Sequence, residues 1–408
     1  MDYFEQASRR GFIIYDSLRE DKIIRRFISL CKEVSEGRLV EAEREHDAFV
    51  SALAQRAEKD GLRGDIFAKY ITSVLLSSEN VFSLACENER PLFTLREIVK
   101  NDIESALFFM RFDIDVIYSA IDRQNVIKNY IPSVSRQNVA IDDISAMSDA
   151  QSVLNALKRF YAENGCGALA FNNMLKLEDE IVGVKNSDPV TFEDIICYDA
   201  QKSALRRNTL KFVNRLPANN MLLVGANGTG KSSCVKALAN EFAGEGLRVL
   251  SVNSSEISRL REVFTKIAER GKRFIVFIDD LSFDTIDYNY LFLKSVLEGD
   301  AETLPPNALI YATSNRRNLV KESWDDRASD VHVEDTLNEK ISLADRFGIT
   351  ISFPRPTPEQ YLDIVRALAE REGVKLTDDK LRSLAFRWEI SKKGFSGRAA
   401  KQFIKSLI

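Results

Sequence analysis

Histidine and cysteine, the residues that build zinc centres and disulfide frameworks, are scarce in this sequence. Its 408 residues include two histidines and five cysteines. The cysteine count is odd and no Cys-X-X-Cys pair occurs, which argues against a disulfide framework and favours a reducing compartment. A histidine-based zinc site or a Ser-His-Asp triad would have to be built from His46 and His332 alone, so we set both aside and expect them at the surface.

Long apolar runs and an excess of positive charge are also missing. The start, MDYFEQASRRGF, lacks the basic stretch and apolar run of a signal peptide, and no segment approaches the roughly 18 apolar residues of a membrane span. Lys and Arg number 57 against 61 Asp and Glu, a net charge of −4, whereas a surface built throughout for nucleic acid needs a positive field. We therefore expect a cytoplasmic protein without a membrane partner, carrying at most a small basic patch.

Apolar residues recur at helical spacing from residue 20 to about 164, which predicts an all-helical N-terminal domain over residues 1–165. No motif in this part carries chemistry that we can name. Its apolar stripes indicate a helical core, with a groove for a partner as the alternative. The Gly- and Asn-rich segment 164–174 that follows is typical of a linker.

The pattern changes after this segment, because short aliphatic runs begin to alternate with helical stretches. Such alternation predicts a parallel, doubly wound α/β sheet, here over residues 172–355. From Pro356 onward only helical patterns remain, which predicts a helical lid over residues 356–408. The expected strands are 221–225, 248–253, 274–279, 308–314 and 348–354.

The run from Gly225 to Ser232 matches the phosphate-loop pattern GxxxxGK[ST], between an expected strand and an expected helix. Glycines let backbone N–H groups surround the phosphates, and the helix N-terminus adds its positive end. Lys231 is expected to reach the β- and γ-phosphates and Ser232 to hold Mg²⁺. The predicted nucleotide-binding residues are Gly225, Ala226, Asn227, Gly228, Thr229, Gly230, Lys231, Ser232 and Ser233.

Two acids and an amide follow later strands. Asp279 and Asp280 end an apolar run, where Asp279 can bind Mg²⁺ and Asp280 can orient and deprotonate an attacking water. Asn315 follows the run 308–314 and can hold that water by its amide. The alternative for each is a residue without chemistry, either a surface acid at a strand end or a turn-forming Asn.

The order of these motifs resembles that of AAA+ ATPases, where they are called Walker A, Walker B and sensor 1. Leu343-Ala-Asp-Arg346-Phe-Gly348 has the place of the arginine finger, and Gly397-Arg398 has that of sensor 2. Over about residues 172–408, several local runs of the sequence are also similar to a bacterial ATP-binding AAA+ family, domain of unknown function 815. The runs that carry this similarity are PANNMLLVGANGTGKSS, FIDDLSFD, LKSVLEGD, YATSNRRNL, LADRFG and SGRAAKQFI.

The resemblance implies a fold, a cofactor set and an assembly. The fold would be an AAA+ module, a five-stranded parallel sheet with a C-terminal helical lid, behind the all-α domain. The cofactors would be ATP and Mg²⁺, with Ser232 and Asp279 as metal ligands. Arg346 would reach the γ-phosphate of a neighbouring subunit, which implies a homo-oligomer such as a ring. The catalytic residues would be Asp280, Asn315, Arg346 and Arg398.

Three departures from the family pattern qualify these expectations. Asp280 stands where most AAA+ enzymes have Glu, which shortens its reach and points to slow hydrolysis, and Glu298 is the next candidate base. Cys197 replaces the usual Gly in the segment 194–214, which resembles the segment of AAA+ ATPases that contacts the adenine base. The run NSSEISRLREVFTK lacks the aromatic-Gly pair of protein-threading motors, which argues against a polypeptide translocase.

The sequence as a whole predicts a Mg²⁺-dependent ATPase that switches or remodels a macromolecular partner, a protein rather than a nucleic acid. One alternative is a nucleotide-sensing scaffold that assembles and hydrolyses little. Another is a DNA-linked loader, which would need a basic stripe. Only scattered basic residues are available for such a stripe, namely Arg206, Arg207, Lys211, Arg215, Arg316 and Arg317.

Overall fold

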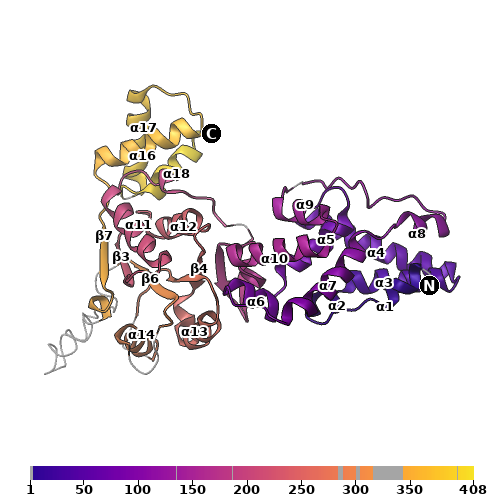
Figure 1. Cartoon of the computed structure of the whole chain (residues 1–408). Coiled ribbons are helices and arrows are strands. Elements are labelled where there is room, and N and C mark those ends of the chain that lie inside the picture. The colour runs from indigo at the N-terminus through magenta and orange to yellow at the C-terminus, as the bar shows by residue number, and fades with distance from the viewer. Residues whose placement is uncertain are drawn as a thin grey trace. The chain divides into compact units, whose positions relative to one another are not determined.

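The computed structural model describes residues 3–134, 136–185, 187–283, 288–299, 304–315, 343–392 and 394–408. The chain forms two compact units, Met1–Phe171 and Asn172–Ile408 (Figure 1). Each unit buries an apolar core of its own. No helix within the ranges given above is long and apolar enough to cross a membrane.

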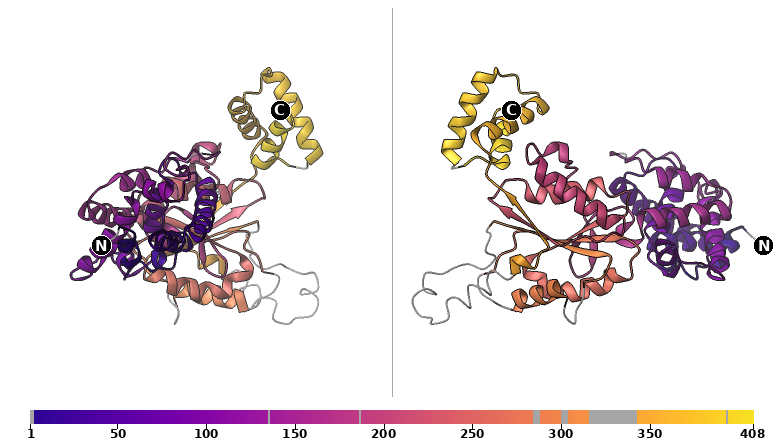
Figure 2. Two further views of the ribbon diagram at one scale, coloured as in Figure 1. Left: turned by 90° about the vertical axis from the view of Figure 1, so that its right-hand side faces the viewer. Right: turned by 60° about the vertical axis from the view of Figure 1, so that its left-hand side comes forward.

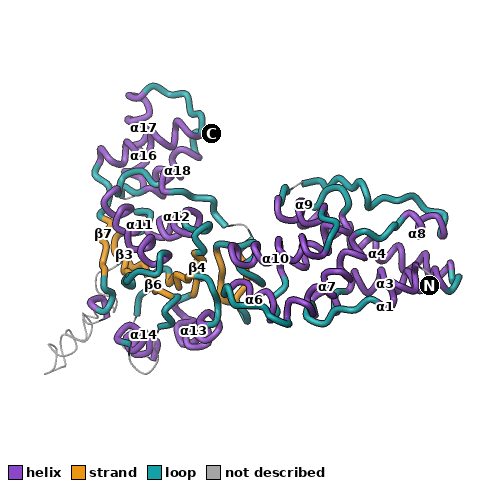
Figure 3. Tube along the Cα trace, viewed as in Figure 1, coloured by secondary structure: helices purple, strands orange, loops and turns teal. Residues whose placement is uncertain are grey.

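The first unit is helical over its described ranges, with one isolated β-bridge between Gly64 and Tyr130 (Figure 3). Aromatic rings fill its core, where the Phe27 ring lies 4.6 Å from Phe67 and 5.1 Å from Phe112 between centroids. Its helices are α1 (Tyr3–Arg9), α2 (Asp16–Arg19), α3 (Lys22–Ser35), α4 (Leu39–Asp60), α5 (Ile66–Ser77), α6 (Val81–Glu87), α7 (Leu95–Met110), α8 (Asp115–Ala120), α9 (Val139–Ala146), α10 (Ala150–Asn164) and the 3₁₀ turn η1 (Gly167–Leu169).

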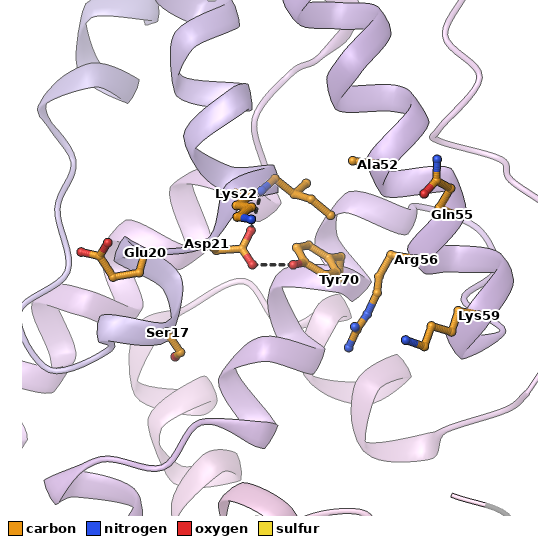
Figure 4. Close-up of a pocket in the computed structure, with 10 residues that line it drawn as sticks. Ser17, Glu20, Asp21, Lys22, Ala52, Gln55, Arg56, Lys59 and Tyr70 are labelled. Carbon is orange, nitrogen blue, oxygen red and sulfur yellow. Dashed lines mark hydrogen bonds between the residues drawn. The ribbon is translucent and has the colours of Figure 1, made fainter. Parts of the chain in front are cut away.

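Two carboxylates of this unit accept hydrogen bonds from residues that are distant in the sequence. Asp102 of α7 is 1% exposed and accepts hydrogen bonds from the backbone N–H groups of residues 13–15. Asp21 caps the N-terminus of α3, and its second oxygen accepts from the Tyr70 hydroxyl of α5 at 2.5 Å (Figure 4). These bonds satisfy backbone groups that the short helix α2 and the start of α3 leave without partners.

His46 corrects one expectation from the sequence. It lies on α4 and is only 7% exposed, with its ring edge-on to Tyr118 of α8 at 5.0 Å between centroids. The predicted surface position is wrong because α8 covers this face of α4. His332 lies outside the described residues. All five cysteines are free thiols.

The second unit contains a seven-stranded sheet in the order β2-β1-β4-β5-β6-β3-β7, parallel except between β1 and β2. The sequence predicted five strands and a linker up to residue 174. The additional pair, β1 and β2, is too short to show a strand pattern and forms by pairing beside β4. The strands are β1 (Met174–Leu177), β2 (Ile181–Gly183), β3 (Met221–Gly225), β4 (Leu247–Val252), β5 (Arg273–Ile278), β6 (Ala308–Ser314) and β7 (Ile349–Phe353).

Helices cover both faces of this sheet. On one face lie α11 (Asp199–Val213) and α12 (Lys231–Glu241), and on the other lie α13 (Leu260–Ala268) and α14 (Tyr288–Glu298) (Figures 1 and 2). The short turns η2 (Phe192–Asp194) and η3 (Ser254–Arg259) precede α11 and α13. The lid has its own apolar core and consists of α16 (Pro358–Arg371), α17 (Asp378–Lys392) and α18 (Gly397–Lys405). The α/β sheet with a helical lid confirms the predicted fold class.

The strand order brings the predicted polar residues together. Strand β6 lies between β5 and β3, and all three are parallel. Their carboxyl ends therefore meet at one edge of the sheet, the edge at which open α/β sheets bind ligands. The phosphate loop follows β3, the acid pair follows β5 and Asn315 follows β6.

Candidate functional site

A cavity of about 650 Å³ lies between this edge of the sheet and the lid. Residues from the phosphate loop, the ends of β5 and β6, the segment before α11, and the lid helices α16 and α18 all line it. The fold thus gathers predicted site residues that are up to 171 positions apart in the sequence. Those that line the cavity are Asn227, Gly228, Thr229, Gly230, Lys231, Ser232, Ser233, Asp279, Asp280, Asn315 and Arg398.

Two glycines shape the phosphate loop. Gly225 has φ +154°, and a Cβ atom there would lie 2.1 Å from the carbonyl oxygen of Phe353 in β7. Gly228 has φ +79°, and a Cβ atom there would lie 3.0 Å from the Cβ of Arg398 in the lid. Glycine is therefore needed at the first position so that β3 and β7 can pair, and at the second so that the lid can approach the loop.

Lys231 begins α12 and is 6% exposed. Its ammonium donates to the carbonyl oxygens of Gly225 at 2.7 Å and Ala226 at 3.0 Å, and to Asn315 Oδ1 at 3.2 Å. Burial lowers the pKa of Lys231, while the nearby Asp279 and Asp280 act in the opposite direction. The ammonium is held by uncharged acceptors, which the charged oxygens of a phosphate can replace with stronger hydrogen bonds.

Ser232 and Asp279 link the phosphate loop to the end of β5. Ser232 Oγ donates to Asp279 Oδ1 at 2.7 Å, so the two predicted metal ligands are in contact. Both offer hard oxygens, which suit Mg²⁺ when waters and phosphate oxygens complete its octahedron. No group of three or more His, Cys, Asp or Glu side chains that could hold a metal ion occurs in the described part of the chain. One carboxylate and one hydroxyl leave most of an octahedron to other oxygens, so this donor pair fits a magnesium ion that is bound together with a phosphate.

Asp280 adopts a left-handed backbone conformation with φ +56°. Its Oδ1 accepts a hydrogen bond from Asn315 Nδ2, and Asn315 Oδ1 accepts from Lys231. Asn315 thus bridges the second acid and the lysine of the loop. Asp tolerates the left-handed region better than most non-glycine residues, which gives a local reason for Asp rather than Glu at this position.

Cations of the lid face the phosphate loop. Arg398 lies in the first turn of α18, and Lys401 and Lys405 follow at helical spacing on the cavity side. Ser396 caps this helix by accepting from the backbone N–H of Ala399 at 3.1 Å. Together with Lys231, these side chains provide positive charge around the space where a polyphosphate would lie.

The part of the cavity next to α11 is apolar and includes Ile195, Ile364 and Leu368. Cys197 has φ +67°, in the left-handed region. That conformation explains why the resemblance places a Gly at this position. The turn therefore forms in this chain despite the Cys, at the cost of local strain.

Arg346 is not among the described residues that line the cavity. Its Nε lies 2.9 Å from Glu298 Oε1 at the end of α14, and its side chain is 50% exposed. Glu298, the alternative base suggested by the sequence, is thus held by an arginine and is not among the cavity residues either.

The sequence reasoning missed Thr313 and the cavity lysines Lys236, Lys401 and Lys405. Thr313 Oγ1 donates to Asp279 Oδ1 at 2.5 Å. The spacing between these residues and the predicted site residues could have identified them. Thr313 precedes Asn315 by two positions, and such residues of a strand face the same side. Lys236 follows Ser232 by four positions, Lys401 follows Arg398 by three, and Lys405 follows Lys401 by four, which are helical intervals.

Comparisons with known proteins place these features in a family. Residues 166–408 match the family described as "Protein of unknown function (DUF815)". The chain is 25% identical to the replication factor C large subunit of Nanoarchaeum equitans, over 54% of this chain and 46% of that protein. It is 26% identical to proteasome-activating nucleotidase 2 of Haloferax volcanii, over 58% of this chain and 56% of that protein. The chain therefore spans about half the length of these relatives.

Among solved structures, the chain matches the Thermotoga maritima RuvB Holliday junction branch migration motor. The match has 14% identity and a TM-score of 0.35, and it covers 53% of this chain and 72% of that one. The family match covers more than half of this chain and includes every predicted site residue. The chain belongs to the family described as "Protein of unknown function (DUF815)", and its second unit has the fold of an AAA+ P-loop module.

Proposed function

We propose that the second unit binds ATP with Mg²⁺ in the 650 Å³ cavity and hydrolyses it at a site shared between subunits. The observation that supports this most is the convergence of three contacts on one cavity. They are the Lys231 ammonium inside the loop, the Ser232–Asp279 pair, and the Asp280–Asn315 pair. A phosphate binder, a metal-binding pair and a base with its orienting amide are the parts that phosphoryl transfer requires.

Each side chain has a distinct task in this proposal. Lys231 exchanges its carbonyl acceptors for oxygens of the β- and γ-phosphates. A magnesium ion held by Ser232 and Asp279 would neutralise charge on those oxygens. Asp280 orients the attacking water and accepts its proton, while Asn315 fixes the carboxylate of Asp280 and contacts the same water. Arg398 approaches the phosphates from the lid, where its permanent charge stabilises the transferred group.

The proposed site needs a second subunit. Arg346 is exposed and lies outside the cavity of its own chain, as expected of a side chain that serves a neighbour. Its contact with Glu298 leaves the rest of the guanidinium's donors for an incoming phosphate. We therefore propose a homo-oligomer, such as a ring, in which each interface completes one active site.

The partner on which this ATPase acts is proposed to be a protein. Replication factor C subunits are among the relatives, but the basic residues considered for a DNA loader give little support to that alternative. Arg206 is paired with Glu241 at 2.9 Å and lies over the Phe192 ring. Arg316 and Arg317 lie outside the described residues. The charge on α11 is thus partly neutralised within the unit.

A nucleotide-sensing scaffold is the second candidate, and the short Asp280 side chain favours it. Asp280 Oδ1 is bound to Asn315, so Oδ2 is left to take the proton of the water, and it must reach that water from a side chain one methylene shorter than Glu. Such a protein would bind ATP and assemble but turn it over slowly.

One pair of measurements tests both functions. A fluorescent ATP analogue is titrated with Mg²⁺ and with EDTA, and ATP turnover is measured at several protein concentrations. Tight Mg²⁺-dependent binding with turnover supports the ATPase. Binding without turnover supports the scaffold, and no binding under either condition rejects both.

A further inference from the structure

Thr313 in β6 is 2% exposed and contacts both acids of the site. Its hydroxyl donates to Asp279 Oδ1 at 2.5 Å and accepts from the backbone N–H of Asp280 at 2.9 Å. Its carbonyl oxygen accepts from the backbone N–H of Leu281 at 2.7 Å. One residue therefore holds three consecutive residues of the segment that leaves β5.

The sheet register explains why these contacts form. Ile278 of β5 pairs with Ala312 of β6, so Asp279 comes next to Thr313. Side chains alternate along a strand, so Thr313 and Asn315 face the same side of β6. Thr313 then meets the first acid while Asn315 meets the second.

The chemistry of a hydroxyl suits both contacts at once. It has one proton and two lone pairs, and here the proton goes to a carboxylate while a lone pair takes a backbone N–H. Valine has the same shape but can do neither. A valine would leave Asp279 with one fewer donor and would leave the Asp280 N–H without its acceptor in the turn at φ +56°.

We propose that Thr313 is a positioning residue for the metal-binding and hydrolytic acids. It aims the Asp279 carboxylate at Ser232 and holds the Asp280 backbone in the left-handed conformation that directs its side chain to Asn315. This inference rests on the proposed function, because it assigns Thr313 to the same metal–nucleotide site. Residues that orient metal ligands typically change metal affinity or activity by about 10–100-fold when they are removed.

Three variants of the full chain separate positioning from packing. Thr313→Val keeps the shape and removes the hydroxyl, while Thr313→Ser keeps the hydroxyl and removes the methyl group. Thr209→Val is the matched control, because Thr209 is also fully buried and its hydroxyl contacts Tyr311 at 3.0 Å, away from the acids. Thr313→Ala replaces Thr313→Val in the comparison with Thr313→Ser if the valine variant does not fold.

The main readout is Mn²⁺ binding, measured by electron paramagnetic resonance on protein loaded with a non-hydrolysable ATP analogue. Thr313→Val should weaken Mn²⁺ binding about 10–100-fold and lower kcat by a similar factor. Thr313→Ser and Thr209→Val should stay within about threefold of the parent.

Three results would overturn the inference, and they are distinguishable. If the parent binds Mn²⁺ with the nucleotide and Thr313→Val does so equally well, Thr313 does not position the acids although the proposed function stands. The same holds if Thr313→Ser is the weaker of the two variants, because packing then dominates. If the parent shows no metal-dependent nucleotide binding, the proposed function and the inference fail together.

Discussion

At the scale of single residues, two short chains of polar contacts connect the ends of three strands. One runs from Lys231 through Asn315 to Asp280, and the other joins Ser232 to Asp279. An ammonium has three protons, and all three protons of Lys231 have acceptors. A buried charge is tolerated when its hydrogen bonds are satisfied. The lysine can therefore remain inside the loop until phosphate oxygens take the place of these acceptors.

The first prediction concerns Lys231→Ala. The substitution removes the charge that should contact the β- and γ-phosphates, so tight binding of ATP should be lost. A fluorescent ATP analogue is titrated in the presence of Mg²⁺, and a melting curve without nucleotide shows that the variant is folded. An affinity within about twofold of the parent, roughly 0.4 kcal/mol, would contradict the assignment of the phosphate loop.

The second prediction concerns Asp280→Asn. Asn also tolerates a left-handed backbone, and its side-chain oxygen can still accept from Asn315, so the local structure should persist. It cannot take a proton from water, so ATP should bind within about twofold of the parent while turnover falls by about 10²–10⁴-fold. Both quantities are measured on the same preparation. Turnover at the parent rate would show that Asp280 is not the base.

At the scale of elements, the lid and the phosphate loop approach each other at Gly228. A Cβ atom on this residue would lie 3.0 Å from Arg398 Cβ and 3.1 Å from Ser396 Oγ. Both lid residues belong to the start of α18. If the loop binds phosphate as proposed, a change in the loop would therefore reach the lid helix that carries Arg398.

The third prediction tests this contact with Gly228→Ala. The left-handed φ of +79° costs a non-glycine residue about 1–2 kcal/mol, and the new Cβ must displace the lid by a few tenths of an ångström. ATP affinity should fall about tenfold, and the second unit should melt at a lower temperature. Gly373→Ala is the control, because Gly373 also has a left-handed φ of +68° and nothing lies within 4 Å of a Cβ there. Equal effects of the two substitutions would argue against a lid–loop contact.

An element can be predicted from the sequence when its own residues carry a clear pattern, without reference to the rest of the fold. Walker-type residues stand at strand ends, and the aliphatic runs of β3 and β5 are long enough to be found without a structure. Strands β1 and β2 have four and three residues, so their pairing depends on β4 rather than on their own pattern. Thr313 is missed for a related reason, because its contact with Asp279 depends on the register between β5 and β6.

At the scale of the whole molecule, the position of Arg346 bears on assembly. The segment that carries it precedes β7, and its guanidinium contacts Glu298 of α14 rather than the cavity of the same chain. The Arg346 side chain is half exposed, and ion pairs at the surface contribute little to stability, about 0–1 kcal/mol. The pair could therefore be rearranged at little cost in the proposed oligomer, where a second subunit would bring a nucleotide to this surface.

The last prediction follows from this placement. Arg346→Ala should bind ATP nearly as well as the parent, because the pocket of the same subunit keeps all its residues. It should hydrolyse poorly, because arginine fingers in other phosphoryl-transfer systems contribute about 10³–10⁵ in rate. Mixing Arg346→Ala with Lys231→Ala protein, each inactive alone, should restore some activity, since an intact pocket can then meet an intact finger from its neighbour. The specific activity of the parent should also rise with protein concentration. Activity that does not change on dilution, together with no rescue on mixing, would mean that Arg346 acts within its own subunit or not at all.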